Sequence, residues 1–170
     1  MQLQKETHPL SDSAFLSLLQ ARKTSFYRVA YGYVKNEEDA KDIVQEAVCK
    51  AYMAKDKLKE TAKFYPWFYR ILTNTAIAFL RQSSRTIAWD EELLQLPSNE
   101  DTDCQDDKLW IHDSLKRLDA KSRTVIILKV YEGMKFFEIA QILNKPESTV
   151  KSMYYRGLQF LKERMQCNGT

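Results

Sequence analysis

Apolar residues recur at helical spacing along the first part of the chain. From Phe15 to Tyr33 they follow one another mostly at intervals of three and four, which predicts one amphipathic helix facing a core. Ser11 and Asp12 are candidate N-caps, because a short polar side chain can accept hydrogen bonds from the first free amides of a helix. The apolar positions are Phe15, Leu18, Leu19, Phe26, Val29, Ala30 and Tyr33.

Two further helices are predicted before residue 86. One starts after Asn36, whose side chain suits an N-cap and which is followed by acidic residues that suit the positive end of the helix dipole. The next starts around Pro66, since proline is favourable in the first helical turn. The expected core faces are Ile43, Ala47, Val48, Ala51 and Tyr52 on the first of these, and Phe68, Leu72, Ala76 and Phe79 on the second.

The last part of the chain has the pattern of a helix, a tight turn and a helix. Asp119 is placed to cap a preceding helix, and Gly133 to end it in the left-handed conformation. Ala140 is small where the next two helices must approach, Asn144 tolerates the positive φ of the turn, and Val150 returns an apolar side chain to the core. A plain helical hairpin and a DNA-binding helix-turn-helix both fit this pattern.

Composition and charge divide the chain into three parts. With only four glycines and four prolines, the turn punctuation that strands need is scarce, which favours helices. The formal net charge is +3, but it is distributed as +5 over residues 1–85, −7 over residues 86–108 and +5 over residues 109–170. We predict an all-α protein in which two small helical domains, 1–85 and 109–170, are joined by a flexible acidic linker at 86–108. The sequence leaves open whether the two domains pack on each other.

The sequence offers little to a catalytic or metal-binding interpretation. Its three cysteines and two histidines share no metal-ligand spacing, no glycine-rich loop could hold a phosphate, and no cluster has catalytic spacing. We therefore expect no enzyme, no cofactor, no metal site and no small-molecule substrate. The chain also has neither a membrane-spanning apolar run nor a signal peptide, which predicts the cytoplasm. The residues concerned are Cys49, Cys104, Cys167, His8 and His112.

A basic stripe follows the helix around Pro66. Its members recur at spacings of three and four, on a different side from the core face, and neighbouring aromatic rings are dense. Arginines neutralise phosphates, an Asn amide can read a base edge, and exposed rings can stack on an unpaired base, so a surface for single-stranded or melted DNA is one interpretation. A merely solvated helix face is the other. The stripe consists of Arg70, Asn74, Arg81 and Arg85.

The start of the last helix presents a second polar and basic face. Its side chains are suitable donors to a major groove and its phosphates, which favours DNA binding over a plain hairpin. These positions are Ser148, Thr149, Lys151, Ser152, Tyr155 and Arg156.

Taken together, three segments in order give the chain, from about Phe26 to Met165, a resemblance to a known family. It resembles the bacterial extracytoplasmic-function sigma factors of the sigma-70 family. The segments are Asp39-Ala40-Lys41-Asp42-Ile43-Val44-Gln45-Glu46, Trp67-Phe68-Tyr69-Arg70-Ile71 with Asn74 and Leu80-Arg81, and Glu138-Ile139-Ala140 through Thr149-Val150-Lys151-Ser152 to Tyr155-Arg156.

The resemblance implies a role for each part. Residues 1–85 would be sigma region 2, docking on the β′ clamp helices of core RNA polymerase through Asp39, Asp42, Gln45 and Glu46. The same region would capture the melted minus ten element with Asn74, with Trp67 and with the residues just before Trp67. Its arginines would bind the phosphates of the DNA backbone. The minus ten set is Lys63, Phe64, Tyr65, Trp67, Arg70, Asn74, Arg81 and Arg85.

Residues 109–170 would be sigma region 4, a helix-turn-helix that reads the duplex minus thirty-five element and contacts the β flap of polymerase. The acidic segment would thread through the polymerase as a nucleic-acid mimic. The usual partner implied is a membrane-bound anti-sigma factor. The alternative is a stand-alone helix-turn-helix regulator that binds duplex operators as a dimer, in which the first domain would serve dimerisation or ligand binding.

Overall fold

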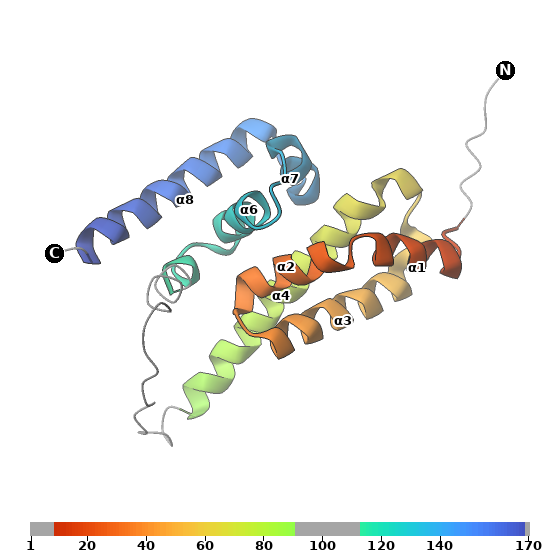
Figure 1. Ribbon diagram of the computed structural model, residues 1–170, viewed down its shortest axis with the longest axis horizontal. Helices are drawn as coiled ribbons and strands as arrows, with labels where there is room; N and C mark the ends of the chain where they lie inside the picture. The colour runs from red at the N-terminus through yellow and green to blue at the C-terminus, as the bar shows by residue number, and fades with distance from the viewer. Residues whose placement is uncertain (1–8, 91–112, 169–170) are drawn as a thin grey trace.

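The computed structural model describes residues 9–90 and 113–168, with side chains described for 9–83 and 113–167, and every regular element in these ranges is helical. This confirms the all-α prediction. Figure 1 shows the helices in chain order. They are α1 (Asp12–Ala21), α2 (Lys23–Val34), α3 (Glu37–Ala54), the short 3-10 turns Lys55–Lys57 and Thr61–Lys63, α4 (Phe64–Asp90), α6 (Ala120–Val130), α7 (Phe136–Leu143) and α8 (Glu147–Asn168).

The helices α1 to α4 form an N-terminal unit in which α2, α3 and α4 pack on one another. Its centre is an aromatic cluster: the Phe26 ring lies 4.4 Å from that of Phe68 and 5.2 Å from that of Tyr69, centroid to centroid. Phe68, Leu72 and Ala76 are fully buried, as the spacing on α4 predicts.

Three predicted helix starts are confirmed by their capping hydrogen bonds. The Ser11 hydroxyl accepts from the Ala14 amide at 3.2 Å, the Asn36 side chain from the Asp39 amide at 3.0 Å, and the Asp119 carboxylate from the Ser122 amide at 3.1 Å. Each cap satisfies an amide that the helix itself leaves free.

The first predicted helix is in fact two, which corrects the sequence interpretation. The chain leaves helical geometry at Arg22, between α1 and α2. The Leu18 carbonyl near the end of α1 accepts a hydrogen bond from the Tyr65 hydroxyl, at 3.2 Å, and the Arg22 guanidinium lies over the Tyr65 ring, 3.9 Å from its centroid. Tyr52 is a second correction: it is 48% exposed instead of buried, with its ring edge against Phe15.

The helices α6 to α8 form a C-terminal unit with the predicted helix-turn-helix. Gly133 and Asn144 have the expected positive φ, 67° and 52°, and Val150 is fully buried. The Asn144 amide donates to the Ala140 carbonyl, which closes α7 and turns the chain into α8.

The two units pack directly on each other. Helix α6 lies between α2 of the N-terminal unit and α8, and α7 packs on α4 (Figure 1). The buried apolar side chains of both units form one continuous cluster. Burial is therefore shared between the units, which the sequence analysis had left open.

Helix α4 continues to Asp90, into the acidic segment 86–108. Residues 91–108, and with them most of the predicted linker, lie outside the described residues. None of the helices in the described part of the chain combines the length and hydropathy needed to cross a lipid bilayer. Among the side chains that can be placed, no three His, Cys, Asp or Glu residues are grouped as a metal site would require.

Candidate nucleic-acid interface

The basic stripe of α4 forms one wall of a groove of about 430 Å³ between the two units. Arg70, Asn74, Ala78 and Arg81 line it. These positions recur at intervals of four, four and three residues, so the helix turns them to the same side. Arg85 lies outside the residues whose side chains are described.

The facing wall of this groove belongs to the C-terminal unit. Lys121, at the start of α6, and Lys145, in the turn before α8, line it together with Thr124 and apolar residues of α7. The groove thus has four cationic side chains and no carboxylate among its lining residues. Such a surface attracts phosphate oxygens.

The aromatic residues predicted to contact DNA divide into buried and partly exposed ones. Phe64 is fully buried, with its ring stacked on Phe68 at 5.8 Å, so the prediction that it contacts DNA is wrong. Tyr65 and Trp67 are half-buried on the same turn, and Lys63 is exposed with its ammonium 3.4 Å from Glu60. Consecutive helix positions point in different directions, so a run of aromatics cannot all face solvent.

The acidic face of α3 lies on the opposite side of that helix from its core positions. Asp42, Gln45 and Glu46 are exposed and Asp39 is half-buried. Glu46 pairs with Lys50 at 2.7 Å, one helical turn further along. An exposed pair of this kind contributes little stability, so this face is free to serve as a contact surface.

The predicted recognition face of α8 is exposed. Ser148, Lys151, Ser152 and Arg156 lie at the surface, Tyr155 is 61% exposed, and Thr149 at the edge is half-buried. These side chains cover one continuous side of the first turns of α8. The helix-turn-helix thus presents donors and an aromatic ring, in an arrangement suited to a major groove.

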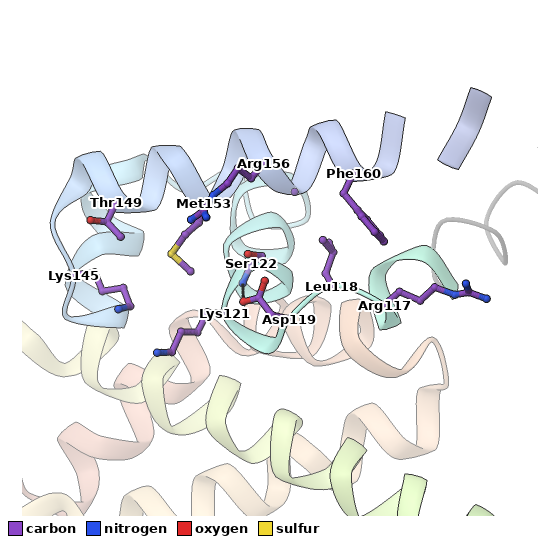
Figure 2. A pocket seen from close by; sticks show the side chains of 11 residues that line it. Arg117, Leu118, Asp119, Lys121, Ser122, Lys145, Thr149, Met153, Arg156 and Phe160 are labelled. Carbon is purple, nitrogen blue, oxygen red and sulfur yellow. Dashed lines mark hydrogen bonds between the residues drawn. The ribbon is translucent and has the colours of Figure 1, made fainter. Parts of the chain in front are cut away.

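A hollow of about 540 Å³ borders this face, between α8 and the start of α6. Figure 2 shows Thr149 and Arg156 from α8, Lys145 from the turn, and Lys121 from α6 around it. Asp119 also lines it, but burial and hydrogen bonding act on this carboxyl in opposite directions: burial raises its pKa, and hydrogen bonds from Ser122 and from the backbone amides of Asp119 and Lys121 together outweigh that effect and lower it. The carboxylate is therefore engaged in capping α6.

Two family models match the chain. The model of sigma-70 region 2 matches residues 14–86, and that of sigma-70 region 4 matches residues 108–161. The RNA polymerase sigma factor SigV of Bacillus subtilis is 38% identical over 140 residues, covering 82% of this chain and 84% of SigV. The chain belongs to the sigma-70 family. A second relative, the ECF RNA polymerase sigma factor SigW of the same organism, is 30% identical over 176 residues, covering 95% and 94% of the two chains, and extends the identification to the extracytoplasmic-function group.

Two solved structures share the fold. CnrH in complex with the cytosolic domain of CnrY has a TM-score of 0.68 at 22% identity, with 92% of this chain and 90% of that chain covered. The sigma factor RpoE in complex with the anti-sigma factor NepR, from Bartonella quintana, has a TM-score of 0.65 at 22% identity, with 89% and 96% covered. Region 2 is therefore the match to α1–α4, and region 4 the match to α6–α8.

In this sigma factor the structure adds candidate contacts that sequence reasoning missed. Lys121 and Lys145 line both the groove beside α4 and the hollow beside α8, and Arg117 also lines the hollow. They join the region 2 stripe and the region 4 recognition face into one basic surface. A usable signal was present in the sequence, since each flanks a predicted helix start, where free amides also favour phosphate.

Proposed function

We propose that this chain is a promoter-specificity subunit of RNA polymerase, with no catalytic activity of its own. It binds the polymerase core, reads the minus thirty-five element as duplex and captures the melted minus ten strand. The observation that carries the proposal is the coexistence, in one chain that belongs to the sigma-70 family, of two faces suited to DNA: the α4 stripe and the α8 recognition face.

Region 2 would supply polymerase binding and strand capture. The exposed carboxylates of α3 give it an acidic docking face for the β′ clamp helices. Asn74 would read a base edge, Arg70 and Arg81 would hold phosphates, and Arg85 would extend this set. An unstacked base would contact the start of α4, through Lys63, Tyr65 and Trp67. Phe64 is left out of this set because it is buried.

Region 4 would read duplex DNA. Ser148, Lys151, Ser152, Tyr155 and Arg156 face outward from the recognition helix, with Thr149 at their edge. Lys121 and Lys145 would bind DNA phosphates beside the major groove. Such phosphate contacts position a protein on DNA, while base contacts give specificity. The same proposal includes the division of the chain into domains 1–85 and 109–170, joined by a linker at 86–108. It also includes contact of region 4 with the β flap of polymerase.

The proposal extends to a regulatory partner and a location. One solved sigma factor of this fold is bound to an anti-sigma factor, which supports a partner of that kind here. That this partner is held in the membrane is part of the proposal and comes from the family resemblance alone. Residence in the cytoplasm belongs to the same proposal.

The test is binding of the purified full-length chain to bacterial core RNA polymerase, in parallel with binding to random-sequence duplex DNA. We expect tight, roughly one-to-one binding to polymerase and weak binding to free duplex. Tight duplex binding without affinity for polymerase would instead establish the stand-alone regulator.

A charge-reversal pair tests the docking face within the same assay. Asp42→Lys places a cation on the acidic face of α3, and we expect affinity for polymerase to fall at least tenfold. Glu37→Lys makes the same change on the opposite side of the helix and should retain binding. Circular dichroism checks that both variants stay helical. A loss of helix in Asp42→Lys, or equal losses of affinity in both variants, would reject the assignment of the face.

A further inference from the structure

The hollow beside the recognition helix lies wholly within region 4. Its volume of about 540 Å³ is in the range of small-molecule sites, and its walls are α8, the start of α6 and the residues just before α6. Along α8 it extends from Thr149 to Phe160, which is about three helical turns. The hollow is therefore elongated, and it can hold a ligand whose two ends differ in chemistry.

One end of the hollow is cationic. Figure 2 shows Lys145, Thr149 and Lys121 at this end, with Arg156 further along α8. Within the described residues these three cations form no ion pair with a carboxylate, whereas two other exposed lysines of region 4 do. The carboxylate among the lining residues, Asp119, accepts a hydrogen bond from the first turn of α6. Unpaired cations around one space attract phosphate oxygens.

The other end of the hollow is apolar. Leu118 and Phe160 lie there, and both are half-buried (Figure 2). Met153, which is buried, lies between this end and the lysines. An aromatic ring at the edge of a hollow can stack on a nucleobase. A simple polyphosphate would leave this end unfilled, and an uncharged ligand would leave the cations without a partner.

We propose that the hollow is a binding site for a nucleoside polyphosphate. Its phosphates are held by Lys121, Lys145 and Arg156, and its base lies against Leu118 and Phe160. Because the proposed function assigns the same cations to DNA, the nucleotide and duplex DNA should compete. Only this competition rests on the proposed function, since the nucleotide site itself requires neither polymerase nor promoter.

The site is tested with the purified full-length chain and a fluorescent ATP that carries an N-methylanthraniloyl group on its ribose. We expect saturable binding, and displacement by unlabelled ATP at concentrations roughly fivefold or more below those of inorganic tripolyphosphate, because the base adds a stacking contact. Charge alone would make tripolyphosphate the better competitor. Adenosine should compete least, since it lacks phosphates. Absence of saturable binding, or displacement by tripolyphosphate as effective as that by ATP, would overturn the proposal.

Two variants separate the ends of the hollow. Lys145→Gln removes a cation and should weaken ATP and tripolyphosphate alike, by roughly tenfold. Phe160→Leu keeps an apolar side chain but removes the ring, so it should weaken ATP roughly fivefold and leave tripolyphosphate unchanged. Lys162→Gln, at an exposed position of α8 outside the hollow, is the matched control and should bind ATP like wild type.

Circular dichroism checks that all three variants stay helical. Because Lys145 lies in a turn and is only half-buried, Lys145→Gln keeps the test decisive even if Phe160→Leu disturbs the packing of α8. An equal loss of ATP affinity in Lys145→Gln and Lys162→Gln would mean that the chain attracts anions without a defined site, and would overturn the proposal.

Competition is measured by adding random-sequence duplex DNA, at concentrations that saturate the chain, to the complex with fluorescent ATP. We expect the nucleotide to be released, and its retention would reject the shared use of the cations. A chain that binds fluorescent ATP but not core polymerase would reject the proposed function and keep the nucleotide site. A chain that binds polymerase without saturable binding of fluorescent ATP would reject the nucleotide site alone.

Discussion

At the scale of single residues, the stripe on α4 shows what sequence periodicity can and cannot predict. Arg70, Asn74 and Arg81 do lie on one side of the helix, because their spacing alone determines that side. Phe64 was assigned wrongly, because an aromatic residue in a dense run is exposed or buried according to its neighbours from other helices, here Phe15 of α1. Nothing local in the sequence indicates those neighbours.

Asn74→Ala tests base readout by region 2. We expect transcription from a duplex promoter to fall five- to a hundredfold, because a well-made contact between an amide and a base edge contributes about 1–3 kcal/mol. Affinity for core polymerase should be nearly unchanged, since Asn74 lines the groove on α4 and the docking face lies on α3. Run-off transcription and a polymerase-binding assay measure the two quantities. Gln82→Ala, on an exposed position of the same helix, is the control, and a loss of polymerase binding by Asn74→Ala would contradict the assignment.

Asp119→Ala tests the cap of α6 and gives a pH dependence. Although burial raises the pKa of this carboxyl, hydrogen bonds from Ser122 and from the backbone amides of Asp119 and Lys121 together hold it below its usual 3.8. A carboxyl with a lowered folded-state pKa adds stability that is present above its unfolded value and is lost as pH falls through the folded one. At about pH 7 the variant should be less stable by about 1 kcal/mol.

Urea denaturation from about pH 7 down to about pH 3 should therefore show the difference between wild type and Asp119→Ala becoming smaller. Asp119→Asn keeps an acceptor oxygen and cannot titrate, so its difference from Asp119→Ala should stay constant with pH. A constant difference between wild type and Asp119→Ala would show that the charge of this cap has no part in stability.

At the scale of whole elements, the sequence predicted where helices begin better than where they break. Caps are local, so Ser11, Asn36 and Asp119 could be identified from neighbouring residues alone. The break at Arg22 lies beside Tyr65, which is distant in the sequence. The Tyr65 hydroxyl donates a hydrogen bond to the Leu18 carbonyl. The apolar spacing continues across the break, so periodicity could not reveal it.

Arg156→Ala tests the recognition helix as a reader of duplex DNA. Arg156 lies at the junction of the exposed face of α8 and the basic hollow, so its loss should weaken promoter recognition by on the order of 1–3 kcal/mol. The effect should be much smaller on a template that lacks the upstream element. Lys121→Ala should act differently. It should reduce affinity for all DNA sequences, because a phosphate contact carries no sequence information, and it should lower the slope of log affinity against log salt concentration by about one. Equal effects of Arg156→Ala on both templates would move this residue from readout to backbone contact.

At the scale of the whole molecule, the run Val125-Ile126-Ile127-Leu128 links sequence, packing and function. Four consecutive apolar residues cannot share one face of a helix, so the run indicates that α6 needs partners on two sides. Which partner covers the second side depends on tertiary structure, and the structure assigns it to α2. The buried cluster that results is continuous through both regions, so we expect them to fold as one unit.

Calorimetry of the full chain tests this continuity. Since the buried cluster runs through both regions, we expect one thermal transition whose calorimetric and van 't Hoff enthalpies agree. At about 0.7 kcal/mol per residue, its enthalpy should exceed what either region could supply alone. Gly32→Leu should weaken the contact between the regions, because a β-carbon added at Gly32 of α2 would lie 2.9 Å from Ile127 Cγ2 of α6. In this variant the transition should split, or the van 't Hoff enthalpy should fall below the calorimetric one. Two separate transitions in the wild-type chain would mean that each region folds on its own core and that the contact through α6 contributes no cooperativity.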